Sequence, residues 1–335
     1  LEAELLLRQG MAQAAREHAV QAAERHAQAC LLESCALLAI AGSAELDLGH
    51  PERALQRALQ AEDLLNQITT TDPVAPLELT ELSAAAQIAS GALTAGTDAA
   101  RRGIAEARAL GLQDLEAKLL QTLATAQMRL GDRSDAERAA RSAYALFEAN
   151  ADRGGLASAS VQLAALAAGR GEAAATRKHL DEALATARKL QLQRILPMAA
   201  AVQLELATLE DDLPLAAQAR ADYADLRLQT DNWDLAEIRW LRTRGKRQEV
   251  ERVVSASPYR AGYQASLAQL ELGRARLEDG DMAGAARAVK LGHSLAQKEG
   301  LRELMLYARL LAGAIGPRQA RNWDRLISGC LRARW

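Results

Sequence analysis

Residues 124–143 read ATAQMRLGDRSDAERAARSA and contain the pattern that decides the fold. Ala124 stands seven positions before Gly131, and Ala136 and Ala143 stand five and twelve positions after it. Residues seven apart lie on nearly one face of a helix, and small side chains on that face let a neighbouring helix approach closely. The segment therefore predicts two helices packed as a hairpin about a turn at Gly131.

The same offsets of five and twelve recur along the chain. They are found at Gly10 (Ala15, Ala22), Gly49 (Ala54, Ala61), Gly171 (Thr176, Ala183), Asp212 (Ala217, Ala224), Gly245 (Val250, Ser257) and Gly280 (Ala285, Gly292). We expect turns at residues 10, 49, 96, 131, 171, 212, 245, 280 and 316, a mean period of about 38 residues that is typical of two-helix repeats.

The composition also favours helices. Hydrophobic residues make up 49% of the 335 positions, but aromatic residues make up only 3%, with a single Phe at Phe147. Ala, Leu, Arg, Gln and Glu are good helix formers, whereas the β-branched and aromatic residues that favour strands are scarce. The sequence predicts an all-α fold in which each repeat buries its apolar surface on its neighbours.

The segment Leu130-Gly131-Asp132-Arg133-Ser134-Asp135-Ala136, with Ala124 and Ala143 around it, resembles the tetratricopeptide repeat. The resemblance covers nearly the whole chain and implies a right-handed α-solenoid of about eight TPR-like hairpins. It also implies that the first helices line a concave face that holds a protein or peptide. The repeats depart from the family because their first helices mostly lack its Trp and Tyr, and most units exceed 34 residues.

These boundaries predict one superhelical domain over residues 1–335. Two prolines and several β-branched residues predict an irregular loop near 68–76, and residues 317–335 are expected to be a terminal capping region. Only a short stretch precedes Gly10, so the chain begins inside a repeat. We take this as an indication that it belongs to a larger polypeptide.

Charge is unevenly distributed. Residues 231–335 carry 19 Lys and Arg against 12 Asp and Glu, a net charge of +7, whereas residues 1–230 have a net charge of −9. Three cysteines do not form a disulfide framework, which favours a cytoplasmic protein, and no apolar run is long enough for a membrane helix. The acidic and basic ends permit head-to-tail self-association.

Motifs for chemistry are missing from the sequence. There is no phosphate-binding glycine loop, and Gly245-Lys246 continues with Arg247. His18, His26 and Cys30 could approach one side of a helix, but packed cysteines and exposed histidines explain them better than a metal site. We expect no enzyme activity, no cofactor and no metal.

All four tryptophans lie in the last third of the chain, where basic residues also gather. Trp233 and Trp240 are seven apart and share a helix face. Aromatic and Arg side chains are the usual anchors of protein interfaces. The predicted partner-binding residues are Trp233, Trp240, Arg239, Arg242, Arg244, Lys246, Arg247, Arg252, Tyr259 and Tyr263. The alternative is that the aromatic residues close the core at the end of the solenoid and the charged ones form a solvated face.

The leading hypothesis for function is a non-catalytic interaction module. Degenerate, long repeats of this kind are similar to those behind the ATPase, cyclase or kinase domains of bacterial signalling and transcriptional regulators, which implies a sensory or scaffolding role. One alternative is a self-standing receptor for a peptide or small effector. A nucleic-acid-binding array is a third, less favoured because base-reading residues are not distributed along the repeats.

Overall fold

The computed structural model describes residues 1–26, 30–68, 73–226, 231–257 and 262–316, and within them every regular element is helical. The prediction of an all-α fold is confirmed. The α-helices are α1 (Glu2–Arg8), α2 (Ala12–His26), α3 (Leu31–Asp47), α4 (Pro51–Leu65), α5 (Val74–Ala89), α6 (Leu93–Ala109), α7 (Gln113–Leu130), α8 (Arg133–Ala149), α9 (Arg153–Gly169), α10 (Ala173–Leu190), α11 (Leu196–Glu210), α12 (Leu213–Ala224), α13 (Asp231–Thr243), α14 (Arg247–Ala256), α15 (Gly262–Glu278), α16 (Met282–Lys298) and α17 (Arg302–Ile315), with a 3₁₀ turn η1 (Gln193–Ile195) before α11.

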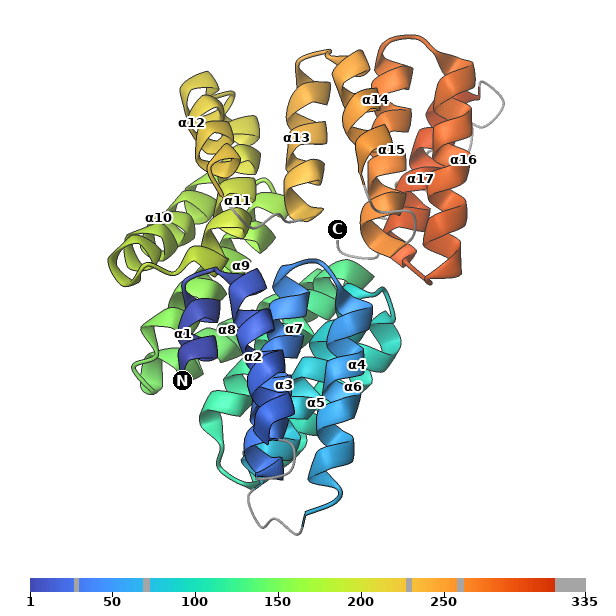
Figure 1. Ribbon diagram of the computed structural model, residues 1–335. Helices are drawn as coiled ribbons and strands as arrows, with labels where there is room; N and C mark the ends of the chain where they lie inside the picture. Colours follow the sequence, from blue (N-terminus) through green and yellow to red (C-terminus); the bar gives the residue numbers. More distant parts are fainter. Residues whose placement is uncertain (27–29, 69–72, 227–230, 258–261, 317–335) are drawn as a thin grey trace. The chain divides into compact units, whose positions relative to one another are not determined.

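The helices follow one another as hairpins (Figure 1). Most close contacts join helices that are consecutive in sequence, as expected for a TPR-like solenoid. The chain divides into two compact units, Leu1–Trp233 (unit 1) and Asp234–Trp335 (unit 2), and the boundary falls inside α13. Each unit is described separately, and the expectation of one domain over 1–335 stays a prediction.

Each hairpin turn has the same backbone structure. One residue adopts the left-handed conformation. The N–H of the residue after it donates to the carbonyl of the residue five positions before the donor, as the Asp132 N–H does to the Gln127 carbonyl at 2.9 Å. This is the Schellman end of a helix, which satisfies a carbonyl that the helix leaves without a partner. The left-handed residues at the eight turns are Gly10, Gly49, Gly91, Gly131, Gly171, Asp211, Gly245 and Gly280.

Two predicted turns were wrong in register. Gly96 lies inside α6 and is buried, while the turn before that helix is at Gly91. The left-handed residue of a later turn is Asp211, one residue before the predicted Asp212, which instead caps α12 by accepting a hydrogen bond from the Leu215 N–H at 2.9 Å. With these corrections, the wide interval that the sequence predicted between the second and third turns disappears.

The corrected turns place a buried residue five positions later in all eight hairpins. These residues are Ala15, Ala54, Gly96, Ala136, Thr176, Ala216, Val250 and Ala285. By contrast, Ala217 and Ala224, predicted from the wrong register, are exposed. Ala61, Ala124 and Ala143 are fully buried as expected. The small-residue pattern therefore marks the line along which the two helices of each hairpin meet.

The predicted loop near 68–76 overlaps the start of helix α5. Helix α5 already begins at Val74, with Pro76 in its first turn, where a missing N–H leaves no hydrogen bond unmade. Residues 69–72 and the predicted capping region 317–335 lie outside the described residues.

The first helices of the hairpins lie on the inner side of unit 1. Among the described residues of unit 1, the larger contacts between non-consecutive α-helices all join odd-numbered helices: α1 with α3, α3 with α5, α5 with α7, α7 with α9, and α9 with α11. Helices on the inside of a curved stack are closer together than those on the outside. We call this side of unit 1 the odd-helix face.

Gly96 provides a test of the close packing between α5 and α6. A Cβ atom there would lie 2.9 Å from the Ala84 carbonyl oxygen and 2.5 Å from Ile88 Cγ1. We expect Gly96→Ala to lower the free energy of unfolding by about 1–3 kcal/mol, because the backbone of α5 cannot move away without losing its other contacts. Urea denaturation measures the change.

Gly154→Ala is the matched control. Gly154 is also helical, but its nearest neighbour to an added Cβ is Asp152 Oδ1 at 3.4 Å. The replacement should be neutral or stabilising by up to about 1 kcal/mol. Equal stability of the two variants would contradict the close approach of α5 and α6.

Candidate partner-binding surfaces

The two tryptophans of α13 lie in the interior. Trp233 is 5% exposed and stacks on Tyr223, with ring centroids 4.0 Å apart and planes 5° apart. Trp240 is also buried, and the Arg244 guanidinium lies 4.2 Å from the centre of its ring in a cation–π arrangement. Their shared helix face is thus a packing face, and little of either ring is accessible to a partner.

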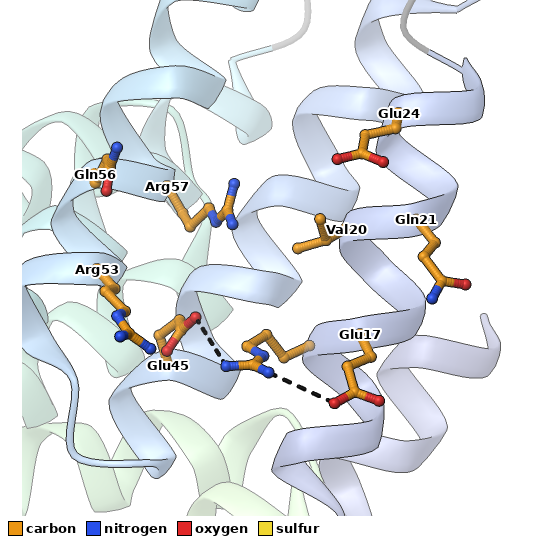
Figure 2. Close-up of a pocket in the computed structure, with 9 residues that line it drawn as sticks. Glu17, Val20, Gln21, Glu24, Glu45, Arg53, Gln56 and Arg57 are labelled. Carbon is orange, nitrogen blue, oxygen red and sulfur yellow. Dashed lines mark ion pairs between the residues drawn. The ribbon is translucent and has the colours of Figure 1, made fainter.

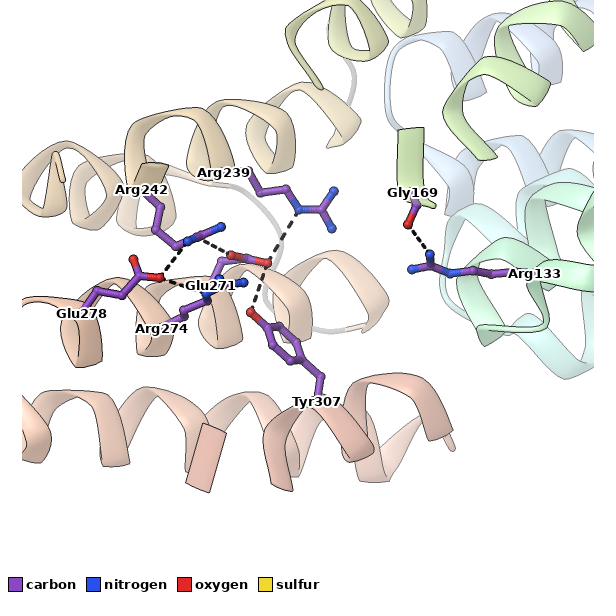
Figure 3. A network of polar contacts seen from close by, with 8 residues as sticks. All are labelled: Arg133, Gly169, Arg239, Arg242, Glu271, Arg274, Glu278 and Tyr307. Atoms are coloured by element: carbon purple, nitrogen blue, oxygen red, sulfur yellow. Dashed lines mark hydrogen bonds and ion pairs between the residues drawn. The ribbon is translucent and has the colours of Figure 1, made fainter. Parts of the chain in front are cut away.

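In the hairpin of α13 and α14, the basic side chains of Arg239 and Arg242 face carboxylates of unit 2 (Figure 3). Arg242 Nε donates to Glu271 Oε2 at 2.9 Å and its Nη1 donates to Glu278 Oε1 at 2.9 Å. Arg239 Nε lies 3.7 Å from Glu271 Oε1. Because Glu271 is buried and Arg242 nearly so, this cluster is a structural ion-pair network rather than a solvated face.

The remaining predicted residues are more exposed. Arg247 pairs with Asp279 at 2.6 Å and Lys246 with Glu249 at 3.1 Å, and Arg252 is exposed. Tyr263 is partly buried, whereas Tyr259 lies outside the described residues, as do Trp323 and Trp335. A partner-binding role for this hairpin stays a prediction, and it now depends mainly on the exposed side chains of Lys246 and Arg252.

Sequence reasoning missed Glu271 as the centre of this network. Its other neighbour is Tyr307, whose hydroxyl lies 3.4 Å from Glu271 Oε1. Burial, and then the charge of Glu271, raise the pKa of Tyr307 to about 12. The sequence did contain a signal for these contacts in its spacing. Glu278 stands 36 residues after Arg242, and Tyr307 stands 36 residues after Glu271, so each pair is about one repeat apart.

An apolar cleft opens on the odd-helix face of unit 1. It has a volume of 160 Å³ and is lined only by residues of two odd helices: Leu32, Cys35, Ala36 and Ala39 of α3, and Val74, Ala75, Glu78 and Leu79 of α5. Cys35 is buried, and burial raises the pKa of its thiol. Glu78 is exposed and is the one charged residue of this lining. The cleft can take an apolar side chain beside a positive group.

Further acidic groups lie along the same two helices. Glu81 accepts a hydrogen bond from the Thr122 hydroxyl of α7 at 2.9 Å, and burial raises the pKa of its carboxyl. Asp47, at the end of α3, also has a raised pKa because it is buried, although the charge of Arg194 opposes the shift. Together with Glu78 they form an acidic stripe, Asp47–Glu81–Glu78, that leads to the cleft.

A larger groove lies between the even helices α2 and α4 (Figure 2). Its volume is 490 Å³, and it is lined by Arg16, Glu17, Val20, Gln21, Glu24, Glu45, Arg53, Gln56 and Arg57. The buried Glu45 lies 2.9 Å from His50 Nδ1 and 3.7 Å from Arg16. Charges of both signs balance one another around this groove, which therefore favours no single class of ligand.

His18, His26 and Cys30, the residues considered for metal binding, have separate surroundings. His18 lies 3.5 Å from Glu2 and His26 lies 3.3 Å from Glu33, while Cys30 is exposed. In the described ranges no group of three His, Cys, Asp or Glu residues is arranged to hold a metal ion. None of the described helices is both long and apolar enough to cross a membrane.

Arg242→Ala tests whether the network is structural. Removing the guanidinium leaves the buried Glu271 carboxylate with the longer contact to Arg239, the weak one to Tyr307 and the nearby charge of Arg274, so we expect a loss of about 3 kcal/mol in unfolding free energy. Arg252→Ala, on the neighbouring helix, removes an exposed charge and should change stability by less than about 0.5 kcal/mol. Chemical denaturation of both variants measures the difference, and an unchanged Arg242→Ala protein would refute the assignment.

The raised pKa of Tyr307 predicts a stability change at high pH. The unfolded phenol ionises near pH 10 and the folded one near 12, so the folded state retains the proton in this window. The contribution of Tyr307 to the free energy of unfolding is therefore fully present below pH 10, and it falls by up to about 2–3 kcal/mol between pH 10 and 12. Tyr307→Phe should decline less steeply over that range in thermal melts. Parallel curves for the two proteins would contradict the burial of this hydroxyl.

No family model matches the chain, and no curated protein matches it. Among solved structures it is similar to a tetratricopeptide repeat protein from Parabacteroides merdae, at 14% identity and a TM-score of 0.47, over 82% of this chain and 98% of that one.

Proposed function

We propose that this chain is a non-catalytic interaction module that holds a segment of another protein on the odd-helix face of unit 1. The cleft between α3 and α5 carries this proposal, because it is bounded only by first helices and combines an apolar floor with the exposed Glu78. Its 160 Å³ is smaller than the usual volume of small-molecule sites, about 300–1,000 Å³, and suits a single anchoring side chain.

The chemistry of the acidic stripe favours a partner segment with both apolar and basic residues. A large apolar residue would remove the lining of the cleft from water, and a Lys or Arg would face Glu78 or Glu81. The net charge of −9 over residues 1–230 would also speed the encounter with a basic segment.

The two alternatives are less well supported. The groove between α2 and α4 has the volume of a small-effector site, but Val20 is the only apolar residue in its lining. For nucleic acid, the basic last third offers less free charge than its composition suggests, since Arg242, Arg247 and Arg276 are paired with carboxylates.

The regulatory part of the proposal rests on the resemblance of the repeats to the degenerate arrays of bacterial regulators. In such a setting, a partner held by this chain would control an attached domain. Peptide binding in the cleft is the step that can be tested first.

A random peptide library displayed on phage tests the binding role. Selected peptides should pair a large apolar residue with Lys or Arg, and Ala36→Trp should weaken them at least about tenfold by filling the cleft. Ala36 is exposed, so its replacement does not disturb the core. Ala105→Trp, at an exposed position of the even helix α6, is the control and should bind like the parent. Equal binding by Ala36→Trp would exclude this cleft, and failure to select any peptide would argue against the function.

A further inference from the structure

One ion pair joins parts of unit 1 that are far apart in the sequence. Arg194 Nε lies 2.7 Å from Asp47 Oδ2, and Arg194 Nη2 donates to Asp47 Oδ1 at 2.8 Å, across 147 residues. Other contacts between repeats span about one period, such as Arg170 with Glu137 and Arg177 with Glu210. The pair therefore holds the connector between the fifth and sixth hairpins against the second hairpin.

The connector that carries Arg194 is longer than the two connectors between hairpins directly before it. Three residues join α6 to α7 and α8 to α9, but five join α10 to α11, including the 3₁₀ turn η1. Gln191 ends α10 in the left-handed conformation, and Pro197 lies in the first turn of α11. Arg194 lies within the additional turn and reaches Asp47 at the end of α3.

This contact combines two short charge-assisted distances with a desolvation cost that opposes them. Asp47 retains only 13% of its side-chain exposure, whereas Arg194 retains 44%. Asp47 Oδ2 is buried, and desolvation opposes ionisation of the carboxyl despite the nearby guanidinium. The cost of desolvating the carboxylate offsets much of the attraction, and the long Arg side chain loses rotamer freedom when held. A competing cation could therefore displace Arg194.

The charge of Arg194 also acts on a second acid of the stripe, Glu81. Burial raises the pKa of Glu81, and the charges of Lys118 and Arg194 oppose that shift. Along α3, Asp47 and Ala36 of the cleft are 11 residues apart, which corresponds to about 16 Å. An extended peptide covers that distance in about five residues.

We propose that Arg194 is an internal latch that occupies the cation position of the partner-binding face. A partner segment with an apolar residue in the cleft and an Arg or Lys about five residues away displaces Arg194 from Asp47. Displacement frees the connector before α11 from the second hairpin, so that binding changes how unit 1 closes. This inference rests on the proposed function for the partner, but the contact itself can be tested without one.

Hydrogen exchange on the whole chain tests the contact. Arg194→Gln keeps a polar side chain but removes the charge, and we expect faster exchange at Leu48, Gly49 and His50, the amides at the end of α3. Arg188→Gln is the matched control, since Arg188 is exposed at the end of α10 and should leave those amides unchanged. Unchanged exchange in Arg194→Gln, or the same change in Arg188→Gln, would overturn the latch.

Peptide affinity tests the displacement. The probes are the tightest phage-selected peptide and its twin in which the basic residue is replaced by Gln. If the closed form is about nine-tenths populated, Arg194→Gln should bind the basic peptide about tenfold more tightly than the parent does. Asp47→Asn should lose the preference for the basic peptide over its twin. If Arg194→Gln fails to fold, Asp47→Asn replaces it as the test, because it removes the other partner of the same ion pair.

The two readouts separate the latch from the proposed function. Faster exchange together with unchanged peptide affinity would overturn the displacement but leave the contact established. If no peptide binds any variant, the proposed function and the displacement both fail, and hydrogen exchange alone still decides whether Arg194 holds the connector.

Discussion

The close approach of two helices behind a left-handed turn is the constraint on which the rest of the structure depends. At all eight turns the residue five positions later is buried against the first helix of its hairpin, from Ala15 to Ala285. Only small or β-branched residues occur there. In the third hairpin the residue is Gly96, with the Ala84 carbonyl of α5 directly opposite. Because each hairpin is built in this way, its odd helix is free to pack on the odd helix of the next hairpin.

This arrangement determines where polar groups can act. Apolar burial between helices is provided largely by Ala and Leu, so the polar residues on the odd helices are left to bind one another one repeat apart. Gln121 donates to Ser158 at 2.6 Å, and Gln162 donates to the Thr125 hydroxyl at 3.0 Å. Between α3 and α5 the face instead retains an apolar cleft beside the exposed Glu78. That difference is the physical basis for placing the partner there.

The charged residues of the two units have different roles. In unit 2, Arg242 holds a buried Glu271 from one repeat away, so the basic character of this region stabilises the fold. In unit 1, Asp47 is paired with an Arg from a distant connector and retains a raised pKa. A buried pair within adjacent repeats forms whenever those repeats fold, whereas the second pair depends on how the whole unit closes.

The sequence by itself determined the helical class, the period and the buried small residues such as Ala124 and Ala136, because helix periodicity and close packing are properties of local spacing. It misplaced two turns, since Gly96 is equally suited to a turn and to a tight helix crossing, and Asp211 and Asp212 can each end a helix. It could not place the cleft, the burial of Trp233 and Trp240, or the pair between Asp47 and Arg194. These depend on which helices curve toward one another, and curvature arises from contacts summed over many repeats, so only the tertiary structure decides it.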